Sequence, residues 1–301
     1  MMQPLQPSQS LEYRHVDVFT REPLSGNGLT VFPDAGSLTA ETMQLVTREM
    51  RQFESIFLLP TGDTDDTYHV RARVFTMEEE LPFAGHPVLG AACALHERLA
   101  SGHERAAWTL DLAAGAVRVS TVRRDGWYEA TMSQGRPLFG ATAGAEFARQ
   151  ILAALNLTED DLSTGLPLAV VSTGLPYLIV PLASGLERAA IVTPGFEALL
   201  AQVGAKFVYV LHVATCEGRT WDNDGRVEDV ATGSAAGPAG AYLVQHGLAK
   251  ASGGELIVHQ GRFLGRPSEM RVRVDVEAQG GEIAAVYVGG DVRMVARGSF
   301  D

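Results

Sequence analysis

Two short segments of small residues, each leading into an apolar helix, constrain the fold of this 301-residue chain more than any other feature. The run FAGHPVLGAA at 83–92 is echoed by ATGSAAGP at 231–238. We call residues 83–90 loop A and residues 229–237 loop B. Their similarity indicates an internal repeat, in which each half of the chain supplies one loop and one helix.

The helices that follow the two loops are predicted from Pro87 to Leu99 and from Ala235 to Leu248. Both are rich in Ala and Leu and largely apolar, which is typical of a helix enclosed by other elements. Strand patterns dominate the rest of both halves. The repeat therefore predicts an α+β fold of two similar domains, each a barrel-like, mostly antiparallel sheet around a central helix.

Strand and helix patterns also suggest where the domains divide. Thr39 is placed to cap a helix, and from Thr67 to Phe75 apolar and polar residues alternate as in a half-buried strand. Residues 133–144 read as a turn. We predict an N-terminal domain of 12–125, completed by the C-terminal strand 290–301, and a C-terminal domain of 126–289. Residues 55–59 form an apolar run, and further strands are expected near 16–19, 29–32, 107–112, 116–121, 127–132, 167–172, 176–182, 206–214, 255–259, 269–276, 284–288 and 292–297.

The composition excludes several classes of partner. A net charge of -12 works against nucleic acid and anionic membranes, both of which need concentrated positive charge. No apolar run approaches the ~20 residues that span a bilayer, and the first residues lack the apolar core of a signal peptide. We therefore expect a soluble cytoplasmic protein whose partner is a small molecule, with no nucleic acid and no membrane.

Loops A and B are candidate anion-binding groups. A loop of small residues at a helix start leaves main-chain N–H groups unpaired and directs the positive end of the helix dipole outward, which suits a carboxylate or a phosphate. The alternative is that their glycines serve only close packing of helix on strand. Neither loop matches G-x-G-x-x-G or G-x-x-x-x-G-K-[ST], so nucleotide binding is not supported.

Three polar side chains of the loops are candidates for chemistry. His86 lies between Gly85 and Pro87, where it can donate to or accept from a ligand, with a structural histidine as the alternative. Asp229 and Ser234 lie five residues apart around loop B. Both could contact a substrate, and Ser234 could instead only cap the helix.

Glu54 is a further candidate because its neighbours Phe53, Ile56 and Phe57 are apolar. Burial in such surroundings raises the pKa of a carboxyl group, which makes it a workable base and acid near neutral pH. Most glutamates are simply solvated, so this residue alone does not establish catalysis.

The sequence supports neither a metal site nor a cofactor. It contains no H-E-x-x-H and no C-x-x-C, and its eight histidines are scattered. Cys93 and Cys216, its only cysteines, are expected to be buried small hydrophobic residues. Lys206 and Lys250 are the only lysines and lie in no motif, so Schiff-base chemistry has little support.

At these motifs the chain resembles the PhzF-like phenazine-biosynthesis family, relatives of diaminopimelate epimerase and proline racemase. The matching segments are HVDVFT at 15–20, PLSGN at 23–27, REM at 48–50 with Glu54, ELPFAGHP at 80–87, EDVATGSAAG at 228–237 and GRPS at 265–268. The resemblance implies the diaminopimelate epimerase-like fold, an active site between the two halves, and commonly a homodimer.

The resemblance also implies roles for individual residues. Glu54 matches the acid/base that shifts a proton, and His86, Asp229 and Ser234 match positions that line the same pocket. Thiol-using relatives carry their two cysteines at positions that match Ala84 and Val230, so carboxylate chemistry is expected here. We assign catalysis to Glu54, Asp229 and His86, and substrate binding to Asn27, Gly85, Thr232, Gly233 and Ser234.

The leading hypothesis is thus a cofactor-independent isomerase or epimerase that moves a proton on a small carboxylic acid. A non-catalytic small-molecule binding protein on the same fold is the alternative. Phosphate or nucleotide recognition by the loops is a third reading, disfavoured by the scarcity of lysine. Fold identity alone assigns no substrate.

Overall fold

The structure is a computed structural model that describes residues 10–59, 68–251, 254–277 and 281–300. Contacts divide the chain into two compact units, Met1–Met132 with Gly289–Asp301 (unit 1) and Ser133–Val288 (unit 2). The division into folding domains at 125/126 and 289/290 stays a prediction. Thr67, where one predicted strand began, lies outside the described residues, as does residue 301.

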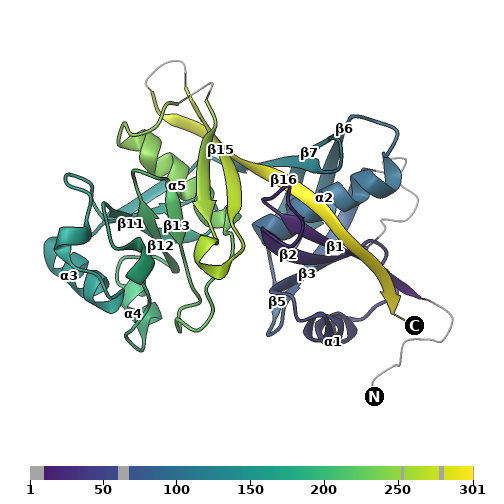
Figure 1. The fold of residues 1–301 in the computed structure, drawn as a ribbon, viewed down its shortest axis with the longest axis horizontal. Coiled ribbons are helices and arrows are strands. Elements are labelled where there is room, and N and C mark those ends of the chain that lie inside the picture. The colour runs from purple at the N-terminus through teal and green to yellow at the C-terminus, as the bar shows by residue number, and fades with distance from the viewer. Residues whose placement is uncertain (1–9, 60–67, 252–253, 278–280, 301) are drawn as a thin grey trace. The chain divides into compact units, whose positions relative to one another are not determined.

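Unit 1 is built on a circuit of hydrogen-bonded strands (Figure 1). Neighbours follow the order β1-β2-β3-β4-β6-β7-β8-β16, and β16 also pairs with β1, which closes the circuit. Of the pairings with a described register, only β2–β3 and β4–β6 are parallel. The strands are β1 (Leu11–Val18), β2 (Asn27–Phe32), β3 (Glu54–Leu59), β4 (His69–Thr76), β6 (Arg105–Leu112), β7 (Gly115–Arg123), β8 (Tyr128–Gly135) and β16 (Ile283–Phe300), with the two-residue β5 (Glu80–Leu81) beside β4.

The helix α2 (Gly85–Leu99) is the central helix of unit 1. It contacts β1, β2, β3, β6 and β7, and every residue from Gly85 to His96 is buried. A Cβ on Gly90 would lie 2.5 Å from Cδ2 of Leu29, so glycine at this position lets the helix approach β2 closely. The predicted enclosure of this helix by a barrel-like sheet is confirmed.

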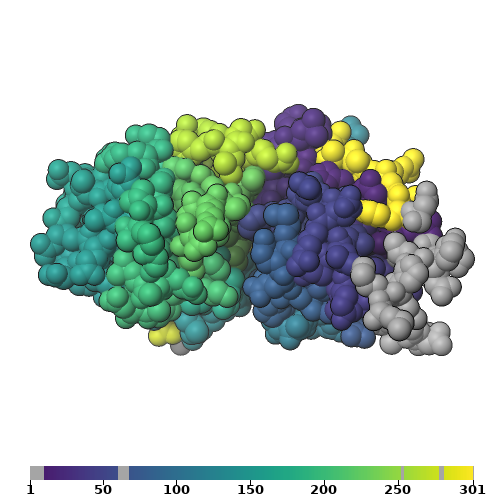
Figure 2. Space-filling model, turned by 90° about the horizontal axis from the view of Figure 1, so that it is seen from below, coloured from purple at the N-terminus to yellow at the C-terminus, as the bar shows by residue number. Residues whose placement is uncertain are grey.

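The helix α1 (Ala40–Met50) covers another part of unit 1. The Thr39 hydroxyl accepts a hydrogen bond from the N–H of Thr42, which is the predicted N-cap. Met43 and Val46 pack in a cluster that includes Phe32, Phe57 and Phe75, while the opposite side of the helix is exposed. Figure 2, seen from below, shows α1 at the surface of its unit.

Unit 2 repeats the plan with a second central helix, α5 (Gly233–Gln245), which contacts β10, β11, β12, β14 and β15. The strand order is β16-β15-β14-β13-β12-β11-β10-β9. These strands are β9 (Leu138–Thr142), β10 (Ala169–Ser172), β11 (Pro176–Leu182), β12 (Phe207–His212), β13 (Glu217–Arg219), β14 (Leu256–Gln260) and β15 (Ser268–Val276). Two helices, α3 (Ala145–Ala154) and α4 (Phe196–Ala201), and three short 3-10 helices, η1 (Glu159–Asp161), η2 (Leu186–Arg188) and η3 (Arg262–Leu264), complete the unit.

The structure corrects two of the sequence predictions. The segment 133–144, read as a turn, contains the end of β8 and the whole of β9. The strands expected at 284–288 and 292–297 are one continuous strand, β16. None of the helices in the described part of the chain is long and apolar enough to cross a membrane.

Candidate active site

Loop A delivers two unpaired main-chain donors at the start of α2. The first N–H groups of a helix have no acceptor within the helix. In α2 these belong to Gly85 and His86, because Pro87 at the third position has no N–H. The preceding residue, Ala84, has no side chain able to cap them.

Two strands of unit 1 place polar side chains beside His86. Asn27 is the first residue of β2 and Glu54 the first of β3, and these neighbouring strands are parallel, with Leu29 opposite Glu54. Both side chains are buried, with exposed fractions of 2% for Asn27 and 6% for Glu54. Asn27, Glu54 and His86 therefore form one buried polar group, which we call the Glu54 cluster.

The imidazole of His86 is the centre of the Glu54 cluster. Its Nδ1 lies 3.2 Å from Oε2 of Glu54 and 3.5 Å from Nδ2 of Asn27, while its Nε2 makes no hydrogen bond with any described residue. Burial lowers the pKa of His86 to about 3, and the main chain of Gly28 only partly opposes this shift. The ring is therefore neutral near pH 7.

A neutral imidazole so close to a carboxyl group restricts where protons can lie. Two unprotonated atoms 3.2 Å apart would repel each other through their lone pairs, so a proton must lie on Nδ1 of His86 or on Oε2 of Glu54. The two side chains thus share one proton in a hydrogen bond and do not form an ion pair of two full charges.

Loop B repeats the arrangement of loop A at the start of α5. The N–H groups of Ala235 and Ala236 both donate to the carbonyl of Thr232, at 3.0 Å each. Those of Gly233 and Ser234 have no acceptor among the described residues. In both helices the unpaired donors belong to a glycine and the polar residue after it.

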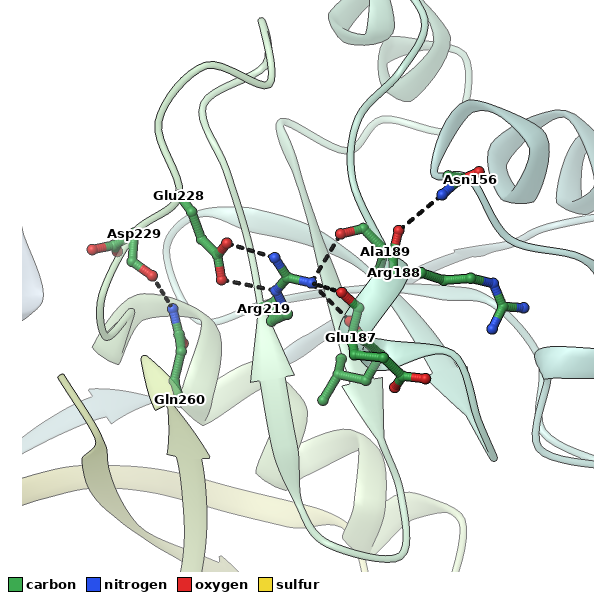
Figure 3. A network of polar contacts seen from close by, with 9 residues as sticks. Asn156, Glu187, Arg188, Ala189, Arg219, Glu228, Asp229 and Gln260 are labelled. Atoms are coloured by element: carbon green, nitrogen blue, oxygen red, sulfur yellow. Dashed lines mark hydrogen bonds and ion pairs between the residues drawn. The ribbon is translucent and has the colours of Figure 1, made fainter. Parts of the chain in front are cut away.

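The side chains of loop B are held by partners elsewhere in unit 2. The hydroxyl groups of Ser234 and Tyr177 lie 2.8 Å apart, and no side chain caps α5, so Ser234 does not act as a helix cap. The hydroxyl of Thr232 donates to the Asp229 carboxylate, and the amide of Gln260 bonds to both residues of that pair. Figure 3 shows Asp229 next to Gln260.

An ion pair anchors the beginning of loop B (Figure 3). Arg219 donates through Nε and Nη2 to the two carboxylate oxygens of Glu228, at 2.8 and 2.6 Å, and both side chains are about nine-tenths buried. Its Nη1 donates to the carbonyls of Leu186, Glu187 and Ala189. The residue immediately before Asp229 is thereby tied to the 3-10 helix η2.

The eight predicted site residues fall into two groups, one in each unit. Asn27, Glu54, Gly85 and His86 come together in unit 1, and Asp229, Thr232, Gly233 and Ser234 come together in unit 2. Sequence reasoning missed Gln260 and Tyr177, which hold loop B. No local pattern marks either of them, because each meets loop B only through the pairing of distant strands.

The cysteines differ from each other. Cys93 is fully buried, as expected, and burial raises the pKa of its thiol well above the usual value. Cys216 is only partly buried, which corrects the expectation for that residue. Across the described residues, no three or more His, Cys, Asp and Glu side chains form a group that could hold a metal ion.

Comparison with known proteins agrees with this fold. A solved structure of a predicted epimerase from Pseudomonas aeruginosa is 51% identical, with a TM-score of 0.88, covering 97% of this chain and 99% of that one. An uncharacterized isomerase, YddE, from Salmonella typhimurium is 36% identical over 275 residues, which are 87% of this chain and 89% of that protein. The trans-2,3-dihydro-3-hydroxyanthranilate isomerase of Pseudomonas aeruginosa is 35% identical over 299 residues, 95% of this chain and 98% of that protein.

These findings define the class of protein: the chain is an isomerase built on the two-unit epimerase fold. The family model described as phenazine biosynthesis-like protein matches residues 16–298. The chain belongs to this family, as its motifs predicted.

Proposed function

We propose that this enzyme moves a proton on a small carboxylic acid, with Glu54 as the acid/base and without a cofactor. The observation that carries the proposal is the pairing of a buried carboxyl group with a neutral imidazole at the start of a central helix. A carboxyl group that is shielded from water and lies beside a neutral imidazole is suited to general acid/base work.

The proposed reaction balances without any external reagent. Glu54 removes a proton from a carbon next to an activating group, and the C–H electron pair moves into the neighbouring π-system. The resulting carboxylic acid returns the proton to a different carbon, or to the other face of the same one. Negative charge that develops in between is stabilised by the unpaired N–H groups of Gly85 and His86.

We further propose that loop B serves the same reaction. The N–H groups of Gly233 and Ser234 offer a second set of donors for a carboxylate, and the Asp229 carboxylate and the Ser234 hydroxyl offer polar contacts. A homodimer, which the family resemblance implies, and a cytoplasmic location, which the composition suggests, also remain proposals.

The decisive variant is Glu54→Gln, which keeps the size of the side chain and removes its ability to take a proton. We expect turnover to fall by about 10²- to 10⁴-fold while the melting temperature changes little. The first probe is trans-2,3-dihydro-3-hydroxyanthranilate, the compound named for the relative that is 35% identical. Its turnover is followed by absorbance and by incorporation of deuterium from heavy water.

Two outcomes would contradict the proposal in different ways. Unchanged turnover by Glu54→Gln would remove Glu54 from the acid/base role. A wild-type protein that binds carboxylic acids, detected by thermal stabilisation, but exchanges no hydrogen with heavy water would instead be a binding protein. Screening cyclic and amino carboxylic acids in the same way identifies the substrate class if the first probe is inert.

A further inference from the structure

Gln260, the last residue of β14, lies under loop B and uses its whole hydrogen-bonding capacity there. Its side chain is buried, with 1% of the residue exposed. Its Nε2 donates to the carbonyl of Asp229 at 2.8 Å and to the hydroxyl of Thr232 at 3.0 Å. Its Oε1 accepts from the N–H of Thr232 at 3.2 Å and from the hydroxyl of Tyr209 at 3.1 Å.

The partners of Gln260 fix the orientation of its amide. The N–H of Thr232 can only donate and the carbonyl of Asp229 can only accept, so the oxygen of the amide must face the first and the nitrogen the second. Because Nε2 then donates to the Thr232 hydroxyl, that hydroxyl directs its own hydrogen to the Asp229 carboxylate. The amide thereby sets the direction of the hydrogen bond that holds Asp229.

The support beneath Gln260 is rigid. Tyr209 is fully buried, and burial raises the pKa of its hydroxyl group, which stays protonated and available as a donor. A Cβ on Gly218 would lie 2.2 Å from the oxygen and from a ring carbon of Tyr209, so the glycine leaves the space that the ring occupies. Gly218 thus leaves the room in which the Tyr209 hydroxyl donates to Oε1 of Gln260.

We propose that Gln260 is a positioning residue of this enzyme, which holds Asp229 and Thr232 in the arrangement that the reaction uses. The inference rests on the proposed function of loop B. Gln260 acts through the two loop residues and touches no substrate itself. Loss of its amide removes the hydrogen bonds from Gln260 to the carbonyl of Asp229 and to the hydroxyl of Thr232, which loosens the hold on both residues.

The test compares Gln260→Met with Tyr209→Phe. Methionine is similar in length and makes none of the four hydrogen bonds, whereas Tyr209→Phe removes one donor and leaves every bond from Gln260 to the loop. We expect Gln260→Met to lower kcat about tenfold to a hundredfold, because small displacements of catalytic groups are costly. Tyr209→Phe is expected to lower the melting temperature but to keep kcat within about threefold of wild type.

The variant Gln260→Glu adds a second measurement, the pH dependence of activity, which would not change if Gln260 had only a structural role. An ionised glutamate cannot donate to the Asp229 carbonyl, but a protonated one can donate a single hydrogen bond there. The activity of this variant relative to wild type should therefore rise as the pH falls, with trans-2,3-dihydro-3-hydroxyanthranilate as the probe. It also replaces Gln260→Met as the test if that variant does not fold.

Hydrogen exchange at the Thr232 amide gives a measurement that needs no substrate. Exchange should accelerate in Gln260→Met and stay near the wild-type rate in Tyr209→Phe. An unchanged exchange rate, or a Gln260→Met variant with kcat within about twofold of wild type, overturns the proposal. If the wild-type protein does not convert the probe, that compound is not its substrate, and the exchange rates still decide the role of Gln260.

Discussion

His86 shows how burial determines what a side chain contributes to a site. With a pKa of about 3 the ring carries no charge near neutral pH, so it cannot attract a substrate carboxylate as a cation. The groups that can attract a carboxylate are instead the main-chain N–H groups at the two helix starts, those of Gly85 and His86 and those of Gly233 and Ser234. The ring can still donate a hydrogen bond to Glu54, or accept one from it, through Nδ1.

The lowered pKa of His86 predicts how the stability of the protein depends on pH. The folded-state pKa lies about 3.5 below the ordinary value of 6.5, so between pH 6.5 and 3 the unfolded state binds a proton that the folded state does not. Stability contributed by the neutral ring is present above pH 6.5 and is lost progressively as the pH falls through this window. His86→Gln should therefore show a shallower loss of unfolding free energy between about pH 7 and pH 5.

Urea unfolding at several pH values measures this difference. His259→Gln, which removes a partly exposed histidine, is the control for the loss of an imidazole. Equal slopes for wild type and His86→Gln would show that His86 titrates in the folded protein much as it does in the unfolded chain.

At the residue scale, the sequence singles out candidate residues whose signal is local. His86 and Ser234 stood out on the loops before the predicted helices, and because each helix begins two residues earlier than predicted, both lie at the second helical position. Gln260 could not be found in this way. Its partners are 28 and 31 residues away in sequence, and only the path of β14 brings them together.

Among the elements, loop B depends most on one buried ion pair. All three nitrogens of the Arg219 guanidinium donate to the Glu228 carboxylate or to main-chain carbonyls around η2. Its guanidinium also lies 4.5 Å from the ring centre of Phe263 and 4.9 Å from that of Trp221. Loop B is thus held just before its first residue by Arg219, and at Asp229 and Thr232 by Gln260.

Removing one partner of this buried ion pair should lower the free energy of unfolding far more than removing one partner of an exposed ion pair. Arg219→Met leaves the Glu228 carboxylate buried and unpaired, which we expect to cost about 3–5 kcal/mol of unfolding free energy. The matched control is Arg73→Met. Arg73 makes the same bidentate contact with Glu80, but the two side chains are 29% and 36% exposed, and the expected cost is ~1 kcal/mol or less.

Chemical denaturation of both variants tests this expectation, and the double variant Arg219→Met with Glu228→Leu should recover much of the loss because no buried charge remains. Similar costs for Arg219→Met and Arg73→Met would mean that the carboxylate of Glu228 reaches water when its partner is removed.

The elements that the sequence failed to predict have physical reasons for being missed. The strand β9 is exposed at all five residues and so lacks the alternation that marks a half-buried strand. The strand β16 was divided because Gly289 and Gly290 read as a break. A Cβ on Gly289 would lie 2.5 Å from the carbonyl oxygen of Ala130, so this glycine allows close pairing instead of ending the strand.

On the scale of the whole molecule, unit 1 is discontinuous and unit 2 is continuous in sequence. The circuit of unit 1 is closed by β16, whose residues Val292 to Phe300 pair with β1. Without β16, β1 and β8 each lose a neighbouring strand and expose unpaired main-chain groups.

This connectivity predicts different behaviour for the two units as fragments. A fragment of residues 133–288 should melt cooperatively, because it holds the whole of unit 2. A fragment of residues 10–132 should not, until a peptide of residues 289–300 is added. Circular dichroism during heating distinguishes these cases, and cooperative melting of 10–132 by itself would contradict the prediction.

The closing strand also sets the order in which the protein can mature on the ribosome. Unit 1 is the first to emerge, yet it must wait with two open sheet edges while the 156 residues of unit 2 (288 − 133 + 1) are translated. The unit that carries Glu54 and His86 is therefore the last to be completed, and during synthesis it is the part of the nascent chain that most needs protection by a chaperone.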